Sequence, residues 1–315
     1  RVTEGDRQDP LVDWLRAVAD PVRLSMLKLM ARDALAVTEL CTILDVQQPA
    51  ASHHLRRLTR CGLVTARRDG NLTFYGRNAH RPPFPRLAEA LEATLADWAL
   101  AEGPRTRLGT VTRQRAERSR RFFEALGDDD ATPELVPAAD YEADLERLLV
   151  THAGGRGRAL ELGPGEGRLL PALAGLFREV IAADPVAERL RRARSRVNGA
   201  AVRNVCFRAV DPLEDAAALG APLDAVVAVM VLHHLPDPEA AVARCAAALA
   251  EDGVLALVEL CPHEQAWTRE RCGDLWLGFE PDALGAWAAS AGLEEAARQF
   301  YAHRNGFRSQ LRLFR

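Results

Sequence analysis

Lysine is almost missing from this sequence of 315 residues, in which Lys28 is the single lysine among 41 lysine and arginine residues. The chain also lacks an apolar run of about 18 residues, the length that a membrane-spanning helix needs. No positively charged segment precedes an apolar stretch, as it does in a secretory leader. We therefore expect a cytoplasmic protein without a membrane partner.

The six cysteines are scattered along the chain and form no C-x-x-C pair. This spacing offers neither a zinc knuckle nor a framework of disulfides, so we expect reduced thiols. No metal site is predicted from the sequence.

Charge is distributed unevenly between the two ends of the chain. Residues 1–121 carry 21 lysine and arginine residues against 14 aspartate and glutamate residues, whereas the remainder carries 20 against 30. A basic front half is typical of DNA contact. The general abundance of arginine explains the same asymmetry, so charge alone does not decide.

The first 80 residues predict short helices followed by a hairpin. Asp20-Pro21 ends one helix and starts the next, Thr38 is expected to cap a third, and Gly62 ends a fourth. Asp69-Gly70-Asn71 is a strong hairpin-turn signal. This order is typical of a winged helix, with the expected elements at Leu11–Ala19, Val22–Ala31, Glu39–Leu44, Gln47–Cys61, Leu63–Arg68 and Leu72–Gly76.

The helix Gln47–Cys61 has two faces of different character. Ala51, Leu55 and Leu58 share one face and should pack inward. The opposite face is polar and cationic, and glutamine and arginine can read adenine and guanine or hold phosphate. A fold used only for protein contacts is the alternative. The DNA-binding candidates in the helix and hairpin are Gln47, Gln48, Ser52, His53, Arg56, Arg57, Arg67, Arg68, Asn71 and Tyr75.

Residues 10–80 resemble the ArsR family of bacterial repressors. The resemblance rests on the stretches AVADPVRLSMLKLM, VTELCTILDV and QQPAASHHLRRLTRCGLVTARRDGNLTFY. It implies a homodimer that places one recognition helix per subunit in the major groove of double-stranded operator DNA. Many members sense metals through a cysteine pair after Glu-Leu, but here Cys41 is followed by Thr42 and Ile43, and one thiolate does not make a soft-metal site.

Residues 82–101 predict a helix with Leu87, Leu91 and Leu95 on one face. That face either packs on its own domain or forms a dimer seam. We expect a winged-helix DNA-binding and dimerisation domain over residues 1–101. A helical linker over 102–140 follows, with a helix at Thr112–Leu126.

From residue 141 apolar strands alternate with helical patterns, which predicts a parallel, doubly wound sheet. The expected fold class is thus an α+β winged helix-turn-helix followed by an α/β Rossmann-like domain over residues 141–315. Its expected strands are Arg158–Leu162, Val180–Ala183, Val205–Ala209, Ala225–Met230, Val254–Glu259 and Leu311–Phe314.

A glycine-rich turn follows the first of these strands, with the pattern Glu161-x-Gly163-x-Gly165-x-Gly167. Glycines let a ligand approach the backbone closely. Arg168 stands where a dinucleotide fingerprint has its last glycine, so the turn suits a nucleoside without pyrophosphate better than NAD. Asp184 and Asp211 end the next two strands and could hold ribose hydroxyls and an adenine amine.

Residues 141–315 resemble class I S-adenosylmethionine-dependent methyltransferases. The resemblance rests on ALELGPGEG, AADP, the acid in AVDPLED and LDAVVAVMVLHHLPDPEAAV. It implies that S-adenosylmethionine or S-adenosylhomocysteine binds here, with Glu161, Gly163 and Gly165 around the methionine moiety. The cofactor-binding candidates are Glu161, Gly163, Gly165, Gly167, Asp184, Pro185, Asp211, Pro212, Met230 and His233.

The whole chain resembles ArsR-type regulators that carry a methyltransferase-like domain. This resemblance implies a DNA-binding transcriptional regulator, expected to repress, that responds to either adenosyl compound and controls methionine-cycle genes. The alternative is a working methyltransferase with a DNA-binding anchor, acting on a small molecule or, less favoured, on arsenite. For that alternative the candidate bases are His234, His263 and Glu264, and Trp267, Trp276 and Phe279 are candidate walls of an acceptor pocket.

Overall fold

The computed structural model describes residues 9–30, 35–69, 72–78, 83–125, 133–200, 202–210, 222–265 and 267–315. The chain divides into two compact units, Arg1–Gln114 and Arg115–Arg315. The division falls inside a helix, in the stretch for which the sequence predicts a linker. Among the described residues no helix combines the length and the apolar character needed to cross a membrane.

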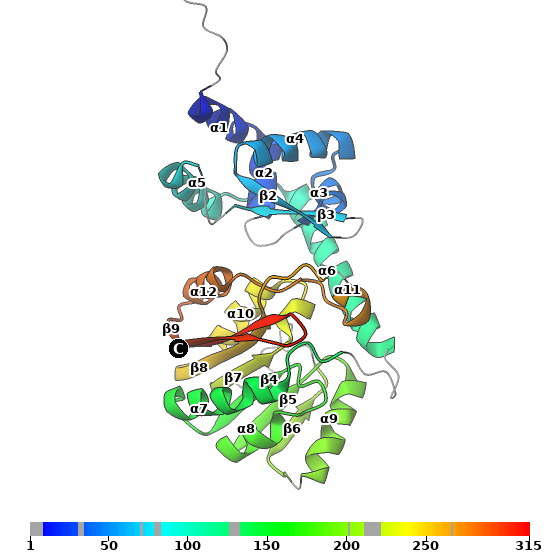
Figure 1. The fold of residues 1–315 in the computed structure, drawn as a ribbon, viewed down its shortest axis with the longest axis vertical. Coiled ribbons are helices and arrows are strands. Elements are labelled where there is room, and N and C mark those ends of the chain that lie inside the picture. Colours follow the sequence, from blue (N-terminus) through cyan, green and yellow to red (C-terminus); the bar gives the residue numbers. More distant parts are fainter. Residues whose placement is uncertain are drawn as a thin grey trace, which may run out of the picture. The chain divides into compact units, whose positions relative to one another are not determined.

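The first unit has the predicted order of helices followed by a hairpin (Figure 1). The hairpin strands pair antiparallel, and a short strand before the third helix joins them in the order β1-β3-β2. The elements are α1 (Pro10–Val18), α2 (Pro21–Leu29), β1 (Leu35–Ala36), α3 (Val37–Leu44), α4 (Gln48–Arg60), β2 (Val64–Asp69), β3 (Leu72–Arg77), α5 (Pro85–Asp97) and α6 (Glu102–Ala125).

Side-chain caps account for the starts of the first two helices in this unit. The Asp9 carboxylate accepts from the Leu11 amide at 2.9 Å, and the Asp20 carboxylate accepts from the Arg23 amide at 2.9 Å. Each cap precedes a proline, which fits the first turn because its missing N–H has no partner there. Ala51, Leu55 and Leu58 of α4 are fully buried, which confirms the predicted inward face.

Two expectations for this unit are wrong in detail. Thr38 does not cap α3, because β1 runs directly into the helix and the Glu39 side chain accepts from the Ala36 amide instead, at 2.9 Å. The helix expected at Thr112–Leu126 begins ten residues earlier, at Glu102. Gly103 and Pro104, which usually mark a break in a helix, led to the later predicted start, although proline is tolerated in the first turn of a helix.

The second unit contains a seven-stranded sheet in the order β6-β5-β4-β7-β8-β10-β9. The five neighbouring strands β6, β5, β4, β7 and β8 are parallel, as predicted, and β10 pairs antiparallel with β8 on one side and with β9 on the other. The elements are α7 (Glu142–His152), β4 (Arg158–Leu162), α8 (Leu170–Leu176), β5 (Glu179–Ala183), α9 (Ala187–Gly199), β6 (Val205–Arg208), β7 (Leu223–Val229), α10 (Pro238–Ala247), β8 (Leu249–Leu260), α11 (Thr268–Arg271), α12 (Pro281–Ser290), β9 (Glu295–Ala302) and β10 (Arg308–Phe314).

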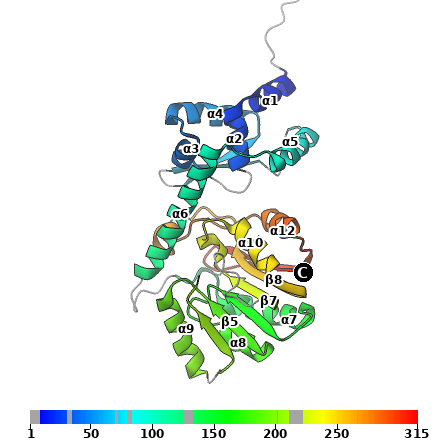
Figure 2. The ribbon, with the colours of Figure 1, turned by 180° about the vertical axis from the view of Figure 1, so that it is seen from behind.

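Helices cover both faces of this sheet. Buried residues of α7, α8 and α9 pack with one set of strand side chains, and those of α10 and α12 pack with the alternate set. Figure 2 gives the view of these layers from behind. Between β4 and β7 the connections change side, and the carboxyl ends of strands at such a switch point are where open α/β sheets bind ligands.

Candidate functional site

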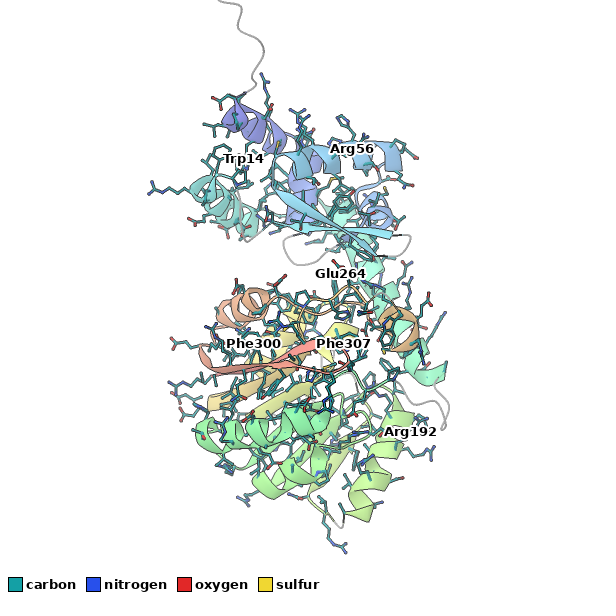
Figure 3. The ribbon with its side chains drawn as sticks, viewed as in Figure 1. Trp14, Arg56, Arg192, Glu264, Phe300 and Phe307 are labelled. Atoms are coloured by element: carbon teal, nitrogen blue, oxygen red, sulfur yellow. The ribbon has the colours of Figure 1, made fainter. Side chains whose placement is uncertain are left out.

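The outer side of α4 is exposed and polar. Gln47 precedes the helix, and Gln48, His53 and Arg56 are exposed, with Arg56 labelled in Figure 3. Ser52, Arg57 and Tyr75 are half-buried, and Tyr75 packs against the core. The backbone of Arg67 and Arg68 lies in β2, whereas their side chains and all of Asn71 lie outside the described part of the chain.

The adjacent histidines of α4 have different surroundings. His53 is exposed, whereas Nδ1 of His54 lies 3.3 Å from Nη1 of Arg23 and 3.7 Å from Oδ1 of Asp20. Burial lowers the pKa of His54. This histidine is therefore held inside its own unit, and His53 is the exposed member of the pair.

The second unit contains a cavity of about 240 Å³ at the carboxyl ends of β4 and β7. The predicted residues Glu161, Gly163, Gly165, Met230 and His233 line it, together with His234. Gly167, Asp184 and Pro185 lie outside its lining, and Asp211 and Pro212 lie outside the described residues.

The turn after β4 needs its glycines. Gly163, Gly165 and Gly167 all have positive φ, at 61°, 55° and 72°. A Cβ on Gly163 would lie 2.5 Å from a methyl of Val231, so glycine is required there for space as well as conformation. Met230, on the facing side of the cavity, also has a positive φ of 52°, a strained state that often marks a functional site.

Glu161 is a buried acid at the bottom of this turn. It is 4% exposed, and its Oε2 has no hydrogen-bond partner among the described residues. Burial raises the pKa of Glu161 to about 8. A cationic group entering the cavity would supply the missing partner and favour the ionised form.

Asp184 ends β5 and is engaged within the protein. Its Oδ1 accepts from the Val186 amide at 2.8 Å, and its Oδ2 lies 3.7 Å from Nε of Arg189. Arg189 lines the cavity and lies over the ring of Phe123 at 4.2 Å. The carboxylate that the sequence predicts to hold a ribose therefore already has partners within the protein.

A buried cluster of acids and histidines forms the far wall of the cavity. Nδ1 of His233 lies 2.7 Å from Oε2 of Glu259, and its Nε2 lies 3.7 Å from Oδ1 of Asp274. Burial opposes a charge on His233, but both carboxylates outweigh it and raise its pKa to about 9. Burial, followed by the charges of His233 and Arg189, lowers the pKa of His234 well below its usual value.

The second half of α6 closes the wall beside this cluster. The Phe123 ring lines the cavity and meets the His234 ring at 4.8 Å. A Cβ on Gly273 would lie 2.4 Å from the Phe122 ring, so the loop before Asp274 packs tightly on the helix. The Arg115 guanidinium lies 4.8 Å from the centre of the Trp276 ring.

The other candidates from the sequence lie elsewhere. His263, Glu264, Trp267, Trp276 and Phe279 are outside the cavity lining, and Glu264 is exposed. Sequence reasoning missed Phe123, Arg189, Glu259 and Asp274. For Glu259 a signal existed, since an acid ends an otherwise apolar strand, whereas nothing in their local sequence links Phe123 or Asp274 to the glycine turn.

The chain matches two protein families over different segments. Residues 113–300, more than half of the chain, match a family described as a methyltransferase domain. Residues 20–66 match the arsR family of bacterial regulatory proteins. The first match includes the second half of α6 and the whole cavity lining from Phe123 to Asp274.

Individual relatives follow the same division. Over 71 residues (22% of this chain) it is 35% identical to an uncharacterized HTH-type transcriptional regulator of Methanocaldococcus jannaschii and spans 80% of that protein. Over 151 residues (44% of this chain) it is 32% identical to the ubiquinone biosynthesis O-methyltransferase of Xanthomonas axonopodis pv. citri and spans 62% of that enzyme. It spans about half the length of further curated regulators that it matches. The N-methyltransferase NodS of Bradyrhizobium japonicum, solved with S-adenosyl-L-homocysteine, superposes with a TM-score of 0.49 and 21% identity, over 65% of this chain and 98% of that protein.

Proposed function

Since the chain belongs to the ArsR family of bacterial regulatory proteins in its first unit and to a methyltransferase family in its second, we propose that it is a transcriptional regulator controlled by an adenosyl compound. The first unit binds operator DNA. The second binds S-adenosylmethionine or S-adenosylhomocysteine, and occupancy there changes the affinity for DNA.

The outer face of α4 supports the DNA-binding part of the proposal. Gln48, at the start of the helix, and Arg56, about two turns later, are exposed hydrogen-bond donors of the types that read base edges. Arg60, in the last turn of the helix, is also exposed and can meet phosphate.

Exposed apolar residues of the first unit support a homodimer. Leu11, Val12 and Leu15 on α1 are 38%, 40% and 45% exposed, and Leu87 on α5 is 40% exposed. The two helices are joined by an edge-to-face contact between Trp14 and Phe84. A second copy that covered this surface would bring two recognition helices to one operator.

The cavity suits the amino-acid end of an adenosyl compound. Both candidate ligands carry an ammonium group, and Glu161 offers a buried carboxyl oxygen without a partner among the described residues. The turn at Gly163 and Gly165 lets the ligand approach the backbone closely.

The observation that supports the coupling is that the single helix α6 contributes residues to both units. In the first unit Val111 of α6 is buried in the core, and Nε of Arg107 donates to the Ile43 carbonyl at 2.8 Å, at the end of α3. In the second unit Phe123 of the same helix lines the cavity. A ligand that displaces Phe123 or Arg189 therefore acts on a helix that is also part of the DNA-binding unit.

The energies required are modest. A ligand shifts a conformational equilibrium only by its difference in affinity for the two states. A coupling of about 1–3 kcal/mol would change DNA affinity by about 5–150-fold.

A titration tests the proposal directly. A pool of random-sequence duplexes is first enriched on the full chain, and the selected duplex is then titrated without ligand, with S-adenosylmethionine and with S-adenosylhomocysteine. We expect the DNA affinity to differ at least about fivefold between free and ligand-bound protein. Equal DNA affinities under all three conditions, with ligand binding verified by calorimetry, would rule out the coupling.

Phe123→Ala separates coupling from binding. We expect this variant to bind both the duplex and an adenosyl ligand, but to lose most of the ligand effect on DNA affinity. Phe300→Ala is the matched control, because Phe300 is an exposed phenylalanine on β9 of the same unit (Figure 3). A full ligand effect in Phe123→Ala would mean that coupling does not pass through this side chain.

Methyl transfer is a second candidate function, favoured by His234 on the cavity wall. Burial lowers its pKa, so the ring is neutral and could take the proton that an acceptor hydroxyl or amine loses as it gains the methyl group. Radiolabelled methyl transfer to small molecules of a cell extract, lost in His234→Gln and kept in His152→Gln, would support it. Arsenite is not favoured, because Cys206 and Cys261 lie outside the cavity lining and burial raises the pKa of Cys272 to about 12.

A further inference from the structure

Three side chains of residue types that can ligate a metal converge on the cavity wall in the second unit. Nε2 of His233 and Nδ1 of His234 lie 3.7 Å and 3.8 Å from the same oxygen, Oδ1 of Asp274. One ligand atom from each residue lies within 4.8 Å of the other two. It is the single group of this kind in the described part of the chain.

Asp274 lacks the partners that a buried carboxylate needs. Its side chain is fully buried, and neither carboxyl oxygen accepts a hydrogen bond of ordinary geometry among the described residues. The hydroxyl of the neighbouring Thr268 donates to the Gln265 carbonyl instead, at 3.1 Å. Buried polar atoms without partners are costly and rare in native proteins, and they often mark the position of an ion or an ordered water molecule. A cation between Asp274 and the two imidazoles would satisfy the carboxylate.

Glu259 orients His233 in the way that metal sites do. Its Oε2 lies 2.7 Å from Nδ1 of His233, and its Oε1 accepts from the amides of Val231 and Leu232 at 3.0 and 2.6 Å. A proton on Nδ1 leaves Nε2 with its lone pair toward Asp274. Histidines that ligate metals almost always donate their other N–H to such a carboxylate or carbonyl.

We propose that His233, His234 and Asp274 bind one divalent transition-metal ion on the cavity wall. Two imidazole nitrogens and one carboxylate oxygen form a ligand set that suits zinc, iron, cobalt or manganese. In a tetrahedral site with bonds of 2.0–2.2 Å, ligand atoms lie about 3.4 Å apart. The two distances to Asp274, 3.7 and 3.8 Å, are slightly longer than this, and the two imidazole nitrogens lie within 4.8 Å of each other, so binding would draw the three side chains together. Three protein ligands leave a position open toward the cavity.

The site lies in the same cavity as the proposed adenosyl site, and His233 is a candidate for both, but its test measures metal binding in the absence of any adenosyl compound. The competing interpretation is a buried ion cluster in which protonated His233 bridges Glu259 and Asp274 without a metal. The two interpretations differ in whether the chain binds a stoichiometric ion.

Metal titration of the full chain decides between them. Protein stripped with a chelator and desalted is titrated with Co²⁺, followed by visible absorption, and with Zn²⁺, followed by equilibrium dialysis and thermal unfolding. We expect one ion per chain, a cobalt spectrum without thiolate charge-transfer bands, and a higher unfolding temperature with Zn²⁺. Absence of stoichiometric binding overturns the proposal, and so does a spectrum with thiolate ligands.

Variants locate the ion. Asp274→Asn, which keeps the size of the side chain, should weaken binding by about 100-fold or more, since even changes behind the ligands cost 10–100-fold. Cys272→Ser, on the same wall, and His152→Gln, at the end of α7, should bind as the unchanged chain does. If circular dichroism shows that Asp274→Asn is misfolded, His234→Gln replaces it. Unchanged binding in a folded ligand variant overturns the proposal.

Discussion

Each unit of the molecule contains a pair of adjacent histidines, and the two pairs lie in opposite environments. On α4 the rings of His53 and His54 are 6.1 Å apart, with His53 exposed and His54 held against Asp20 and Arg23. After β7 the rings of His233 and His234 are 4.1 Å apart inside the cavity wall.

The difference comes from the carboxylates that the fold places beside each pair. Burial lowers the pKa of both His54 and His234. At His233 two acids from distant segments reverse that effect and raise the pKa to about 9. The same dipeptide thus lies on a partly exposed helix face in one unit and in a cavity wall in the other, and the tertiary partners make the difference.

Removing the carboxylate partner of each pair should separate the two environments most clearly. Glu259→Ala leaves three buried amides and His233 without their acceptor, and we expect the second unit to lose about 3–5 kcal/mol of unfolding free energy. Asp20→Ala removes a helix cap and should cost the first unit about 1 kcal/mol.

Urea unfolding with a short protease pulse, mapped by mass spectrometry, assigns each loss to its unit. A Glu259→Ala loss no larger than that of Asp20→Ala would contradict the view that the second pair depends on its buried acids. The measurement is made in chelator, so that bound metal does not contribute.

The two units should also respond to pH with opposite signs. Folding raises the pKa of Glu161 from 4.5 to about 8, so the folded second unit holds a proton that the unfolded chain has lost. The stability that Glu161 contributes is therefore fully present below about pH 4.5 and is lost as the pH rises to about 8, by roughly 5 kcal/mol. The pKa of His54 is lowered, so the first unit instead loses stability as the pH falls below 6.5.

Glu161→Gln and His54→Gln each remove one of these dependences of unfolding free energy on pH. Glu161→Gln should reduce the loss of stability of the second unit with rising pH to the part that His233 causes, and should leave the first unit unchanged. His54→Gln should remove the loss of stability of the first unit with falling pH. The same unfolding assay from pH 5 to 9, with every sample brought to one pH for the protease pulse, measures both. A second unit that gains stability up to pH 8 would contradict the buried, unpaired state of Glu161.

Local patterns in the sequence predicted most of the fold. Asp20-Pro21, Gly62 and the alternation of Leu72–Gly76 act within a few residues, so the winged helix could be placed almost element by element. The parallel strands followed from their apolar runs. The edge strand β9 was missed, because EAARQFYA has one partner strand and mostly partly buried or exposed side chains, and its sequence has no clear strand pattern.

The cavity could be predicted where its lining residues directly follow β4 and β7. Glu161, Gly163 and Gly165 are close together in a recognisable motif, and Met230 and His233 follow the neighbouring strand. The opposite wall comes from Phe123 and Asp274, which are 151 residues apart in sequence and belong to no shared motif. Such a juxtaposition is set by the packing of α6 and of the loop after α11, which a local pattern does not contain.

Exposed arginines on the two units should differ in their effect on DNA affinity, and this is the smallest effect that we expect. Arg56 on α4 has only the Ser52 carbonyl as a partner among the described residues, at 3.2 Å, whereas Arg191 on α9 is paired with Glu188. We expect Arg56→Ala to lower DNA affinity by about 5–150-fold, equivalent to 1–3 kcal/mol, and to leave adenosyl-ligand affinity unchanged. Arg191→Ala should change neither. Fluorescence anisotropy at two salt concentrations, with calorimetry for the ligand, measures both effects. Equal losses of DNA affinity would mean that the second unit also contacts DNA, because a paired arginine in an acidic unit has no other reason to matter for that affinity.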